Sequence, residues 1–202
     1  MIYQIRKRTE PEDIAYSLYL SLFPWSFTKK YIQAVSRFVK RSHTAIRDWI
    51  QRYKPEMLSS RKISVTEFII DETIIKVGSE YIWLWIAIEN DNREILQISI
   101  SKERNMFVAE RFIQSLIRKY GEHPVSTDGG TWYPQACRFL KIRHNLHSAF
   151  EKSIIERTIQ YIKDRTEYFD DYFPCRKSKC KLQHIQKWLD LFVSHHNNNL
   201  LS

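Results

Sequence analysis

Apolar side chains recur along the chain in three successive patterns, and each pattern predicts a different kind of structure. Over residues 11–54 they return every three or four positions, which is typical of amphipathic helices. Over residues 65–127 they alternate with polar residues or run continuously, which predicts strands with one helix among them. Over residues 131–196 the helical spacing returns. The chain therefore predicts a helical first part, a sheet-containing centre and a mainly helical last part.

The first part predicts a helix-turn-helix. One helix is expected between Phe27 and Val39 and a second from near Ser42 to Tyr53, joined by the basic turn Lys40-Arg41-Ser42; an earlier helix is expected over Glu12 to Leu22. The second helix would present side chains suited to base edges and phosphates in a DNA groove. These are His43, Thr44, Arg47, Asp48, Gln51 and Arg52. A small three-helix bundle without a DNA-binding role gives the same pattern.

The centre and the last part predict three meandering strands followed by alternating helices and strands. This α/β connectivity is that of a ribonuclease H-like domain, in which a mixed sheet is flanked by helices, the first strand is central and carboxylates gather at one edge. We expect strands over 66–77, 81–88 and 96–100, a helix over 106–120, a strand over 124–128, a helix after Thr131, a strand around Ile142, and helices over 151–168 and 182–194. The inward side of the helix over 106–120 is expected to carry Phe107, Phe112, Ile113, Leu116 and Ile117.

Charge follows the same division of the chain. Residues 1–60 hold 11 Lys and Arg against 5 Asp and Glu, residues 61–173 hold 16 against 17, and residues 174–202 hold 5 against 1. Basic ends around a nearly neutral centre suggest that the ends bind a polyanion, although many small proteins are mildly basic. We therefore predict a helix-turn-helix domain over 1–60, a catalytic domain over 61–173, and a basic loop and helix over 174–202 that pack on the catalytic domain.

The composition argues against a membrane protein and against a secreted one. The longest apolar run, Tyr81 to Ile88, is far shorter than the ~20 residues of a membrane helix. The N-terminus lacks the apolar centre of a secretory signal, and three cysteines are too few for a disulfide scaffold. We expect no membrane association and a cytoplasmic protein, associated with the nucleoid when bound to DNA.

Three acidic residues are candidates for metal chemistry. Asp71 interrupts an apolar strand, where a buried carboxylate needs a metal, strong donors or a salt bridge to Arg. Asp128 closes a strand ahead of two glycines, a place open to a metal and a phosphate but also common in turns. Glu156 shares a polar helical stripe with Gln160 and Lys163, which a merely solvated face would also explain.

Together these acids fit two-metal-ion phosphoryl transfer. Two divalent ions about 4 Å apart need carboxylates from several elements of the fold. Mg²⁺ and Mn²⁺ prefer such oxygen ligands. A strand Asp, a strand-end Asp and a helical Glu, in that order on this fold, meet the requirement.

Short motifs around these acids resemble a known family. They are Asp71-Glu72-Thr73 ahead of Trp83-Leu84-Trp85, Thr127-Asp128-Gly129 ahead of Tyr133-Pro134, and Ile155-Glu156-Arg157 ahead of Ile162-Lys163-Asp164-Arg165. The chain is similar over nearly its whole length to compact insertion-sequence transposases of the Asp-Asp-Glu type, in the IS-six group.

The resemblance implies a catalytic triad of Asp71, Asp128 and Glu156 and a contact of Lys163 with DNA at the transposon end. Asp128 and Glu156 are 28 residues apart, fewer than in most members, which makes Glu151 a second candidate. Glu156 is preferred because Lys163 follows it at i+7.

The predicted function is that of a DNA transposase. It would bind the terminal inverted repeats of an insertion sequence, hydrolyse a phosphodiester and join the 3′-hydroxyl to target DNA, by replicative, cointegrate-type transposition. Holding both ends requires a homodimer or a larger assembly on double-stranded DNA. The alternatives are a catalytically inactive DNA-binding regulator and a ribonuclease H-like nuclease without strand transfer.

Weaker signals lie outside the triad. Cys175, Cys180 and His184 have spacings that a zinc site allows, but a fourth ligand is not evident nearby. Trp132 and Tyr133 could stack on an unpaired base, although core aromatics are the default. His144 and His147 precede the candidate helix and are expected to be structural. The basic run over 176–181 is expected to follow DNA phosphates or to be a solvated loop.

Overall fold

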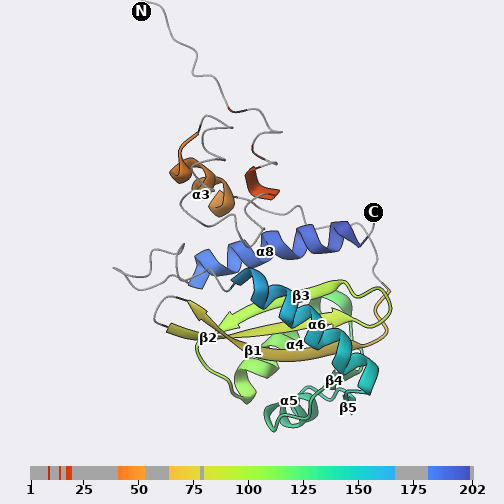
Figure 1. Ribbon diagram of the computed structural model, residues 1–202. Coiled ribbons are helices and arrows are strands. Elements are labelled where there is room, and N and C mark those ends of the chain that lie inside the picture. The colour runs from red at the N-terminus through yellow and green to blue at the C-terminus, as the bar shows by residue number, and fades with distance from the viewer. Residues whose placement is uncertain are drawn as a thin grey trace, which may run out of the picture.

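A five-stranded mixed sheet forms the centre of the protein (Figure 1). The structure is a computed structural model that describes residues 9, 14, 17–19, 41–52, 64–77, 80–166 and 182–200. Within these ranges the side chains of residues 43, 47, 50, 51, 165, 166, 184 and 199 are not described.

The strand order is β3-β2-β1-β4-β5, so the first strand is central, as predicted. β1 (Phe68–Val77), β2 (Glu80–Glu89) and β3 (Ile95–Ser101) form an antiparallel meander. β4 (Val125–Thr127) pairs in parallel with β1, and β5 (His144–Leu146) pairs in parallel with β4. The order and directions of the strands confirm the mixed sheet flanked by helices that the sequence predicted.

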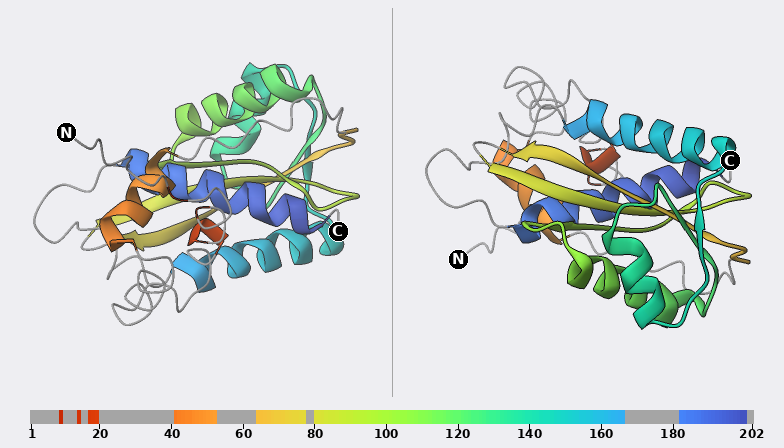
Figure 2. Two further views of the ribbon diagram at one scale, coloured as in Figure 1. Left: turned by 90° about the horizontal axis from the view of Figure 1, so that it is seen from above. Right: turned by 90° about the horizontal axis from the view of Figure 1, so that it is seen from below.

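Helices cover both faces of the sheet, which gives three layers (Figure 2). α6 (Ala149–Thr166) and α8 (Leu182–Asn199) cover one face, and α4 (Met106–Tyr120) and α5 (Trp132–Phe139) cover the other. Alternation along β1 divides its side chains between the two cores, with Ile69 in one and Phe68 in the other. The strand therefore presents Asp71 to the α6 face and Glu72 to the α4–α5 face.

Local sequence explains where α4 begins and ends. The Asn105 side chain accepts a hydrogen bond from the Val108 N–H at 3.1 Å, which caps the first turn. Gly121 follows the last turn with φ 93° and donates its N–H to the Ile117 carbonyl at 2.8 Å. The limits of this helix agree with those predicted from the sequence.

α8 protects the outer strand of the sheet. The Asn197 side chain pairs with both the N–H and the carbonyl of Ile95 at 3.0 Å. Gln186 donates to the Ile98 carbonyl at 3.0 Å. Side-chain amides thus occupy backbone groups that an edge strand would otherwise leave open. The helix continues to Asn199, five residues beyond its predicted end.

Three expectations about the fold were wrong in detail. Phe107 is 66% exposed rather than inward, because it lies nine residues before Leu116 and hence on the opposite side of α4. Tyr81 is exposed although its strand was expected to be covered on both faces. The strand expected around Ile142 is β5, which begins two residues later.

In the N-terminal region the structure describes one helix of the predicted pair. α3 (His43–Arg52) follows Ser42, whose hydroxyl accepts a hydrogen bond from the Ala45 N–H at 3.2 Å. It packs near α8 (Figure 1). The helix predicted between Phe27 and Val39 lies outside the described residues, and the helix predicted over Glu12 to Leu22 lies mostly outside them.

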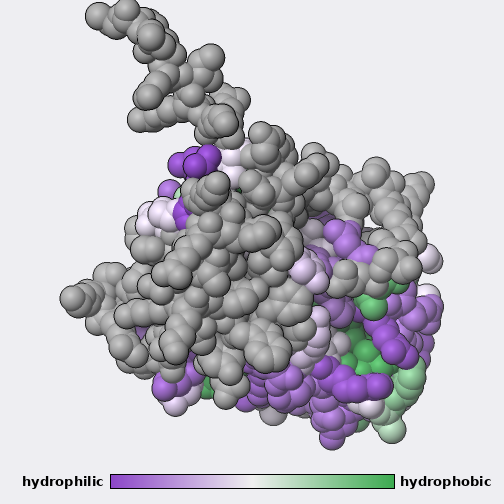
Figure 3. All heavy atoms as spheres, turned by 45° about the horizontal axis from the view of Figure 1, so that its top comes forward, coloured by the Kyte–Doolittle hydropathy of each residue, from purple (hydrophilic) through white to green (hydrophobic). Residues whose placement is uncertain are grey.

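The helices cover the apolar faces of the sheet. The described outer surface that remains, on the face drawn in Figure 3, is mainly hydrophilic, with smaller hydrophobic areas. In the part of the chain that the structure describes, no helix is long and apolar enough to cross a bilayer.

Candidate active site

Asp71 lies in the middle of β1 and faces α6. It is opposite Ile86 in the antiparallel pair, and its carboxylate accepts the N–H of Glu72 at 2.8 Å. Burial raises the pKa of this carboxyl to about 7, an effect that the backbone N–H opposes and the nearby charges of Glu72, Asp128 and Glu156 increase. Within the described residues Asp71 forms no ion pair. Its negative charge is therefore poorly compensated.

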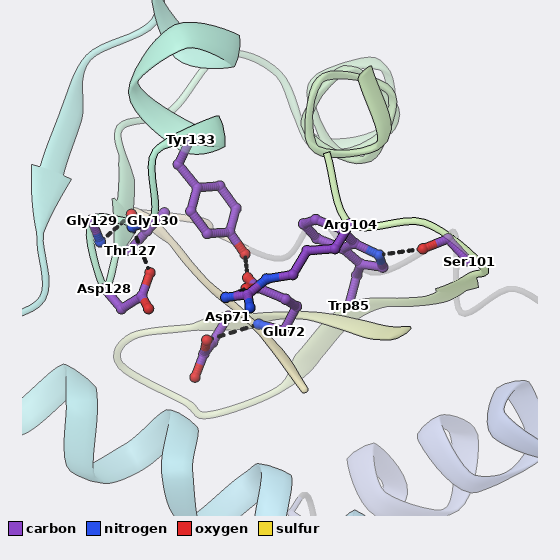
Figure 4. A network of polar contacts seen from close by, with 10 residues as sticks. All are labelled: Asp71, Glu72, Trp85, Ser101, Arg104, Thr127, Asp128, Gly129, Gly130 and Tyr133. Carbon is purple, nitrogen blue, oxygen red and sulfur yellow. Dashed lines mark hydrogen bonds and ion pairs between the residues drawn. The ribbon is translucent and has the colours of Figure 1, made fainter. Parts of the chain in front are cut away.

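Asp128 lies beside Asp71 because β4 runs parallel to β1. Phe68 pairs with Val125 and Ile69 with Ser126, and continuing this register places Asp128 next to Asp71. The Asp128 carboxylate accepts the Gly130 N–H at 2.9 Å and is turned toward the β1 segment that carries Asp71 (Figure 4). Two carboxylates thus come together at the centre of the sheet.

Gly129 makes the turn after Asp128 possible. Its φ of 87° is a left-handed conformation, and a Cβ atom there would stand 2.8 Å from the Leu146 side chain. Its N–H donates to the Thr127 hydroxyl at 3.1 Å. The positive φ therefore favours glycine in the turn that carries Asp128, and any other residue would also have to displace the end of the exposed Leu146 side chain.

Glu156 reaches the site from α6. Ile155 and Ile159 of this helix are buried in the core formed with β1. The Glu156 carboxylate is mostly exposed, 4.0 Å from Lys152 Nζ, and close enough to Asp71 that its charge raises the pKa of that group. The structure therefore brings Asp128 beside Asp71 and places Glu156 on the helix that covers the same face of the sheet, near enough for its charge to act on Asp71.

Glu151, the other candidate on α6, forms the start of that helix. Its carboxylate accepts the Ser148 N–H at 2.6 Å, and its own N–H donates to the Ser148 hydroxyl at 3.2 Å. This reciprocal pair is a capping box. Burial acts to raise the pKa of Glu151, but hydrogen bonds from Ser148 and Ser126 hold it below its ordinary value. The geometry gives Glu151 a helix-capping role.

Glu72, on the opposite face of β1, has the partners that Asp71 lacks. Its buried carboxylate forms an ion pair with Arg104 at 2.6 Å and accepts a hydrogen bond from the Tyr133 hydroxyl (Figure 4). A salt bridge to an Arg was one of the expectations for Asp71. The structure places an Arg, Arg104, beside Glu72 instead. Arg104 was missed because it lies in a short polar connection that has no periodicity.

Aromatic side chains surround this ion pair. The Arg104 guanidinium lies 4.5 Å from the Trp83 ring centre and 3.9 Å from that of Trp132. Tyr133 is fully buried, and burial, followed by the charge of Glu72, raises the pKa of its phenol well above the ordinary value. Tyr133 therefore contributes to the core and is not exposed for stacking on a base.

The two histidines support β4. His144 Nε2 lies 2.8 Å from the Thr127 hydroxyl, and His147 Nδ1 lies 2.9 Å from that of Ser126. Burial lowers the pKa of both imidazoles. These contacts are next to the Asp128 turn and agree with the structural role expected of both residues.

The residues present fit divalent cations shared between pairs of carboxylates. Among the described residues no cluster of three or more His, Cys, Asp or Glu groups encloses a single ion. In phosphoryl-transfer sites, however, Mg²⁺ is commonly held by one or two carboxylates together with water and substrate phosphates. Asp71 offers such a pair with Asp128, its neighbour in the β1–β4 register, and the charge of Glu156 acts on the same carboxylate; a cation would compensate the charge that burial destabilises.

The predicted DNA-binding residues are only partly described. On α3, Thr44, Asp48 and Arg52 are exposed, whereas the side chains of His43, Arg47 and Gln51 lie outside the described residues. Lys163 is half-buried on α6, seven residues after Glu156. Cys175, Cys180, the basic run over 176–181 and the side chain of His184 also lie outside the described residues.

Comparisons with known proteins extend this description. Residues 65–198 match the family model of the DDE domain of IS240-type transposases. An uncharacterized protein of Methanocaldococcus jannaschii is 29% identical over 196 residues, which are 95% of this chain and 87% of that protein.

Solved structures that match this chain include those of retroviral integrases. The HTLV-2 integrase catalytic core domain in complex with magnesium, in its dimeric form, is 18% identical over 49% of this chain and 67% of that chain, with a TM-score of 0.40. The BIV integrase catalytic core is 15% identical over 63% and 82%, with a TM-score of 0.43. The simian T-cell lymphotropic virus intasome in complex with a PP2A regulatory subunit is 15% identical over 78% and 63%, with a TM-score of 0.47.

The family assignment rests on the sequence match, which covers well over half of the chain and includes Asp71, Asp128 and Glu156. It confirms the resemblance to the IS-six group. The chain belongs to the DDE transposase family, and its DDE domain is of the IS240 type.

Proposed function

We propose that the protein is an active transposase that cuts DNA at the ends of an insertion sequence and joins the freed 3′-hydroxyl to target DNA. Asp71, Asp128 and Glu156 are the proposed catalytic residues. The observation that carries the proposal is that the charges of Asp128 and Glu156 act on the partly buried carboxylate of Asp71, whose pKa is raised to about 7, chiefly by burial. A carboxylate with a raised pKa is suited to binding a cation beside the phosphate whose charge changes during the reaction.

Asp71 and Asp128 would hold one divalent ion and Asp71 and Glu156 a second, either Mg²⁺ or Mn²⁺. The two ions would activate the attacking oxygen and stabilise the leaving oxygen of an in-line displacement. Asp71 would contribute to both ion positions, because it is the carboxylate on which the charges of both Asp128 and Glu156 act. The β1–β4 register places Asp128 next to Asp71. Gly129, which has no side chain, allows the turn after Asp128 to pass close to Leu146.

DNA binding in this proposal has two parts. Lys163, on the same helix as Glu156, would contact the backbone of the transposon end. The helix-turn-helix would read the terminal inverted repeats through α3, with Thr44 and Arg52 exposed for that purpose and His43, Arg47 and Gln51 contributing from the same helix. Both ends of the element must be held at once, so the working form would be a dimer or a larger assembly on DNA.

The test is cleavage and joining of labelled DNA that carries the element's own ends. The wild type is compared with Glu156→Gln and Glu151→Gln, and with Glu122→Gln as a control at an exposed site beyond α4. Divalent-dependent cleavage and joining should disappear in Glu156→Gln and persist in the other two. Loss in Glu151→Gln with activity in Glu156→Gln would reassign the glutamate.

Two other outcomes identify other functions. Specific binding of the ends by the wild type without cleavage in Mg²⁺ or Mn²⁺ would indicate a DNA-binding regulator. Cleavage without joining would indicate a nuclease without strand transfer.

A further inference from the structure

Glu72 contacts both segments that carry the two aspartates: it belongs to β1, with Asp71, and it binds α5, which follows Asp128. It is adjacent to Asp71 in β1 but projects to the opposite face of the sheet, where its side chain is 1% exposed. Its partners come from the β3–α4 connection (Arg104) and from α5 (Tyr133). α5 begins four residues after Asp128, so Tyr133 and Asp128 belong to one short segment.

Hydrogen bonds connect the two aspartates through Glu72. The Glu72 N–H donates to Asp71, and the Tyr133 hydroxyl donates to the Glu72 carboxylate. The Tyr133 N–H donates to the Gly130 carbonyl at 3.0 Å, and the Gly130 N–H donates to Asp128 at 2.9 Å. Each connection is made by groups within a few residues of one of the aspartates (Figure 4). The path is short and continuous.

Arg104 stabilises the same segment from the other side. Its guanidinium lies between Trp83 of β2 and Trp132 of α5, while it pairs with Glu72. The Trp132 ring in turn packs against Gly130, where an added Cβ would stand only 2.7 Å away. The Asp128 turn is therefore packed under Trp132, which Arg104 covers.

The contacts of Glu72 with Tyr133 and Arg104 are costly to break. A buried carboxylate without donors is unfavourable, so Glu72 keeps both side chains in place. Mg²⁺ requires nearly ideal octahedral geometry, whereas Ca²⁺ accepts more flexible geometry. Small changes in the separation of two carboxylates would therefore affect Mg²⁺ more than Ca²⁺.

We propose that Glu72, Tyr133 and Arg104 form a positioning group that sets the separation of the Asp71 and Asp128 carboxylates for a shared divalent ion. This inference rests on the proposed function, because it assumes that the aspartates bind the ion. Tyr133 and Arg104 act through Glu72 and through the Asp128 turn and do not touch the ion.

Isothermal titration of the full chain with Mg²⁺ and with Ca²⁺ tests the proposal without an activity assay. The variant Tyr133→Phe removes one hydroxyl and keeps the ring. Its control is Tyr120→Phe, which removes a hydroxyl that donates to the Leu96 carbonyl at 2.9 Å on the same side of the sheet. Arg104→Lys is the second variant, because Lys keeps the charge but loses the planar fork and its stacking between the tryptophans. Asp71→Asn locates the binding.

Tyr133→Phe should weaken Mg²⁺ binding by about tenfold, the usual range for removing a residue that supports a metal ligand, and Ca²⁺ binding by less. Arg104→Lys should do the same, and Tyr120→Phe should leave both affinities within about twofold of wild type. Circular dichroism before titration identifies any variant that does not fold, in which case the other variant decides.

Two failures are distinguishable. Unchanged Mg²⁺ affinity in a folded Tyr133→Phe or Arg104→Lys, with binding lost in Asp71→Asn, would overturn the positioning role alone. Equal losses for Mg²⁺ and Ca²⁺, or losses in Tyr120→Phe as well, would reduce the group to general stabilisation. Wild-type binding that survives in Asp71→Asn would overturn the metal site and with it the proposed function.

Discussion

The two faces of β1 hold neighbouring carboxylates in opposite situations. Glu72 is buried with an Arg partner and a Tyr donor, both supplied by the protein. Asp71 is partly buried, with one backbone N–H and the charges of other acids near it, and burial followed by these charges raises its pKa to about 7. The backbone imposes the same strand on both, so the difference comes from what each face places opposite the carboxylate.

The contrast distinguishes a carboxylate that stabilises the fold from one that is suited to a ligand. The ion pair of Glu72 with Arg104 and its hydrogen bond from Tyr133 are present in the folded chain and contribute to its stability. With its raised pKa, Asp71 is expected to make the metal-free fold less stable at neutral pH, a cost that a bound cation would remove. Four predictions examine whether this distinction holds, in order of decreasing effect.

The largest effect is expected on DNA cleavage by Asp71→Asn. The substitution keeps the shape and removes the charge, so divalent-dependent cleavage should fall on the order of 10³-fold or more. Cleavage rates are measured on labelled DNA ends against Glu122→Gln. Residual activity within tenfold of wild type would show that Asp71 is not a catalytic residue and would contradict the distinction between Asp71 and Glu72.

Arg104→Ala is expected to affect the fold instead. It leaves Glu72 buried and unpaired, and because Arg104 is partly exposed we expect a loss of about 2–3 kcal/mol in the free energy of unfolding. Urea denaturation at pH 7 measures it, with Arg118→Ala as a control that removes a contact to Gln114 on the exposed side of α4. A loss no larger than that of the control would show that the Glu72 face is not a stabilising site.

The pH dependence of stability should differ between the wild type and Asp71→Asn. Between the unfolded pKa of 3.8 and the folded pKa of about 7, the folded chain keeps a proton that the unfolded chain releases. The contribution of Asp71 to stability is therefore full below pH 3.8 and is lost as the pH rises through 7. In EDTA at pH 8, Asp71→Asn should be more stable than wild type by about 1–3 kcal/mol, after allowance for solvent screening.

At pH 4 the two proteins should be nearly equal in stability, and Mg²⁺ at pH 8 should reduce the difference by stabilising the wild type. Urea denaturation at the three conditions gives the comparison. A wild type that is more stable than Asp71→Asn at pH 8 without metal would contradict the uncompensated charge.

The smallest effect is expected at the start of α6. Ser148→Ala removes one side of the capping box and should lower the free energy of unfolding by about 1 kcal/mol. Titration calorimetry should find its Mg²⁺ affinity unchanged. A loss of metal binding similar to that of Asp71→Asn would place the Glu151 end of α6 in the site and would reopen the choice between the two glutamates.

Much of the fold could be predicted from periodicity, because α4 and α6 each bury one apolar face and β1 buries apolar side chains on both of its faces. The register that brings Asp128 to Asp71 follows from parallel pairing of residues 57 positions apart in the chain, such as Phe68 and Val125, which alternation alone does not specify. The exposed Phe107 shows that an apolar residue in an amphipathic helix need not face the core.

The candidate site was predictable where a polar residue interrupts an apolar pattern, as Asp71 does. Arg104 and the partnership of Tyr133 with Glu72 were not predictable, because they depend on how a loop and a helix pack on the far face of the sheet. In the sequence only Lys163, at i+7, favoured Glu156 over Glu151; in the structure the contacts of Glu151 with Ser148 and Ser126 distinguish it from the exposed Glu156.

The most direct test of the central claim is anomalous diffraction from crystals of the protein soaked in Mn²⁺. The account predicts an anomalous peak between the carboxylates of Asp71 and Asp128, at about 2.0–2.3 Å from an oxygen of each, that is absent in crystals of Asp71→Asn. Ordered crystals of the wild type with no peak at these carboxylates, or with the same peak in Asp71→Asn, would contradict it.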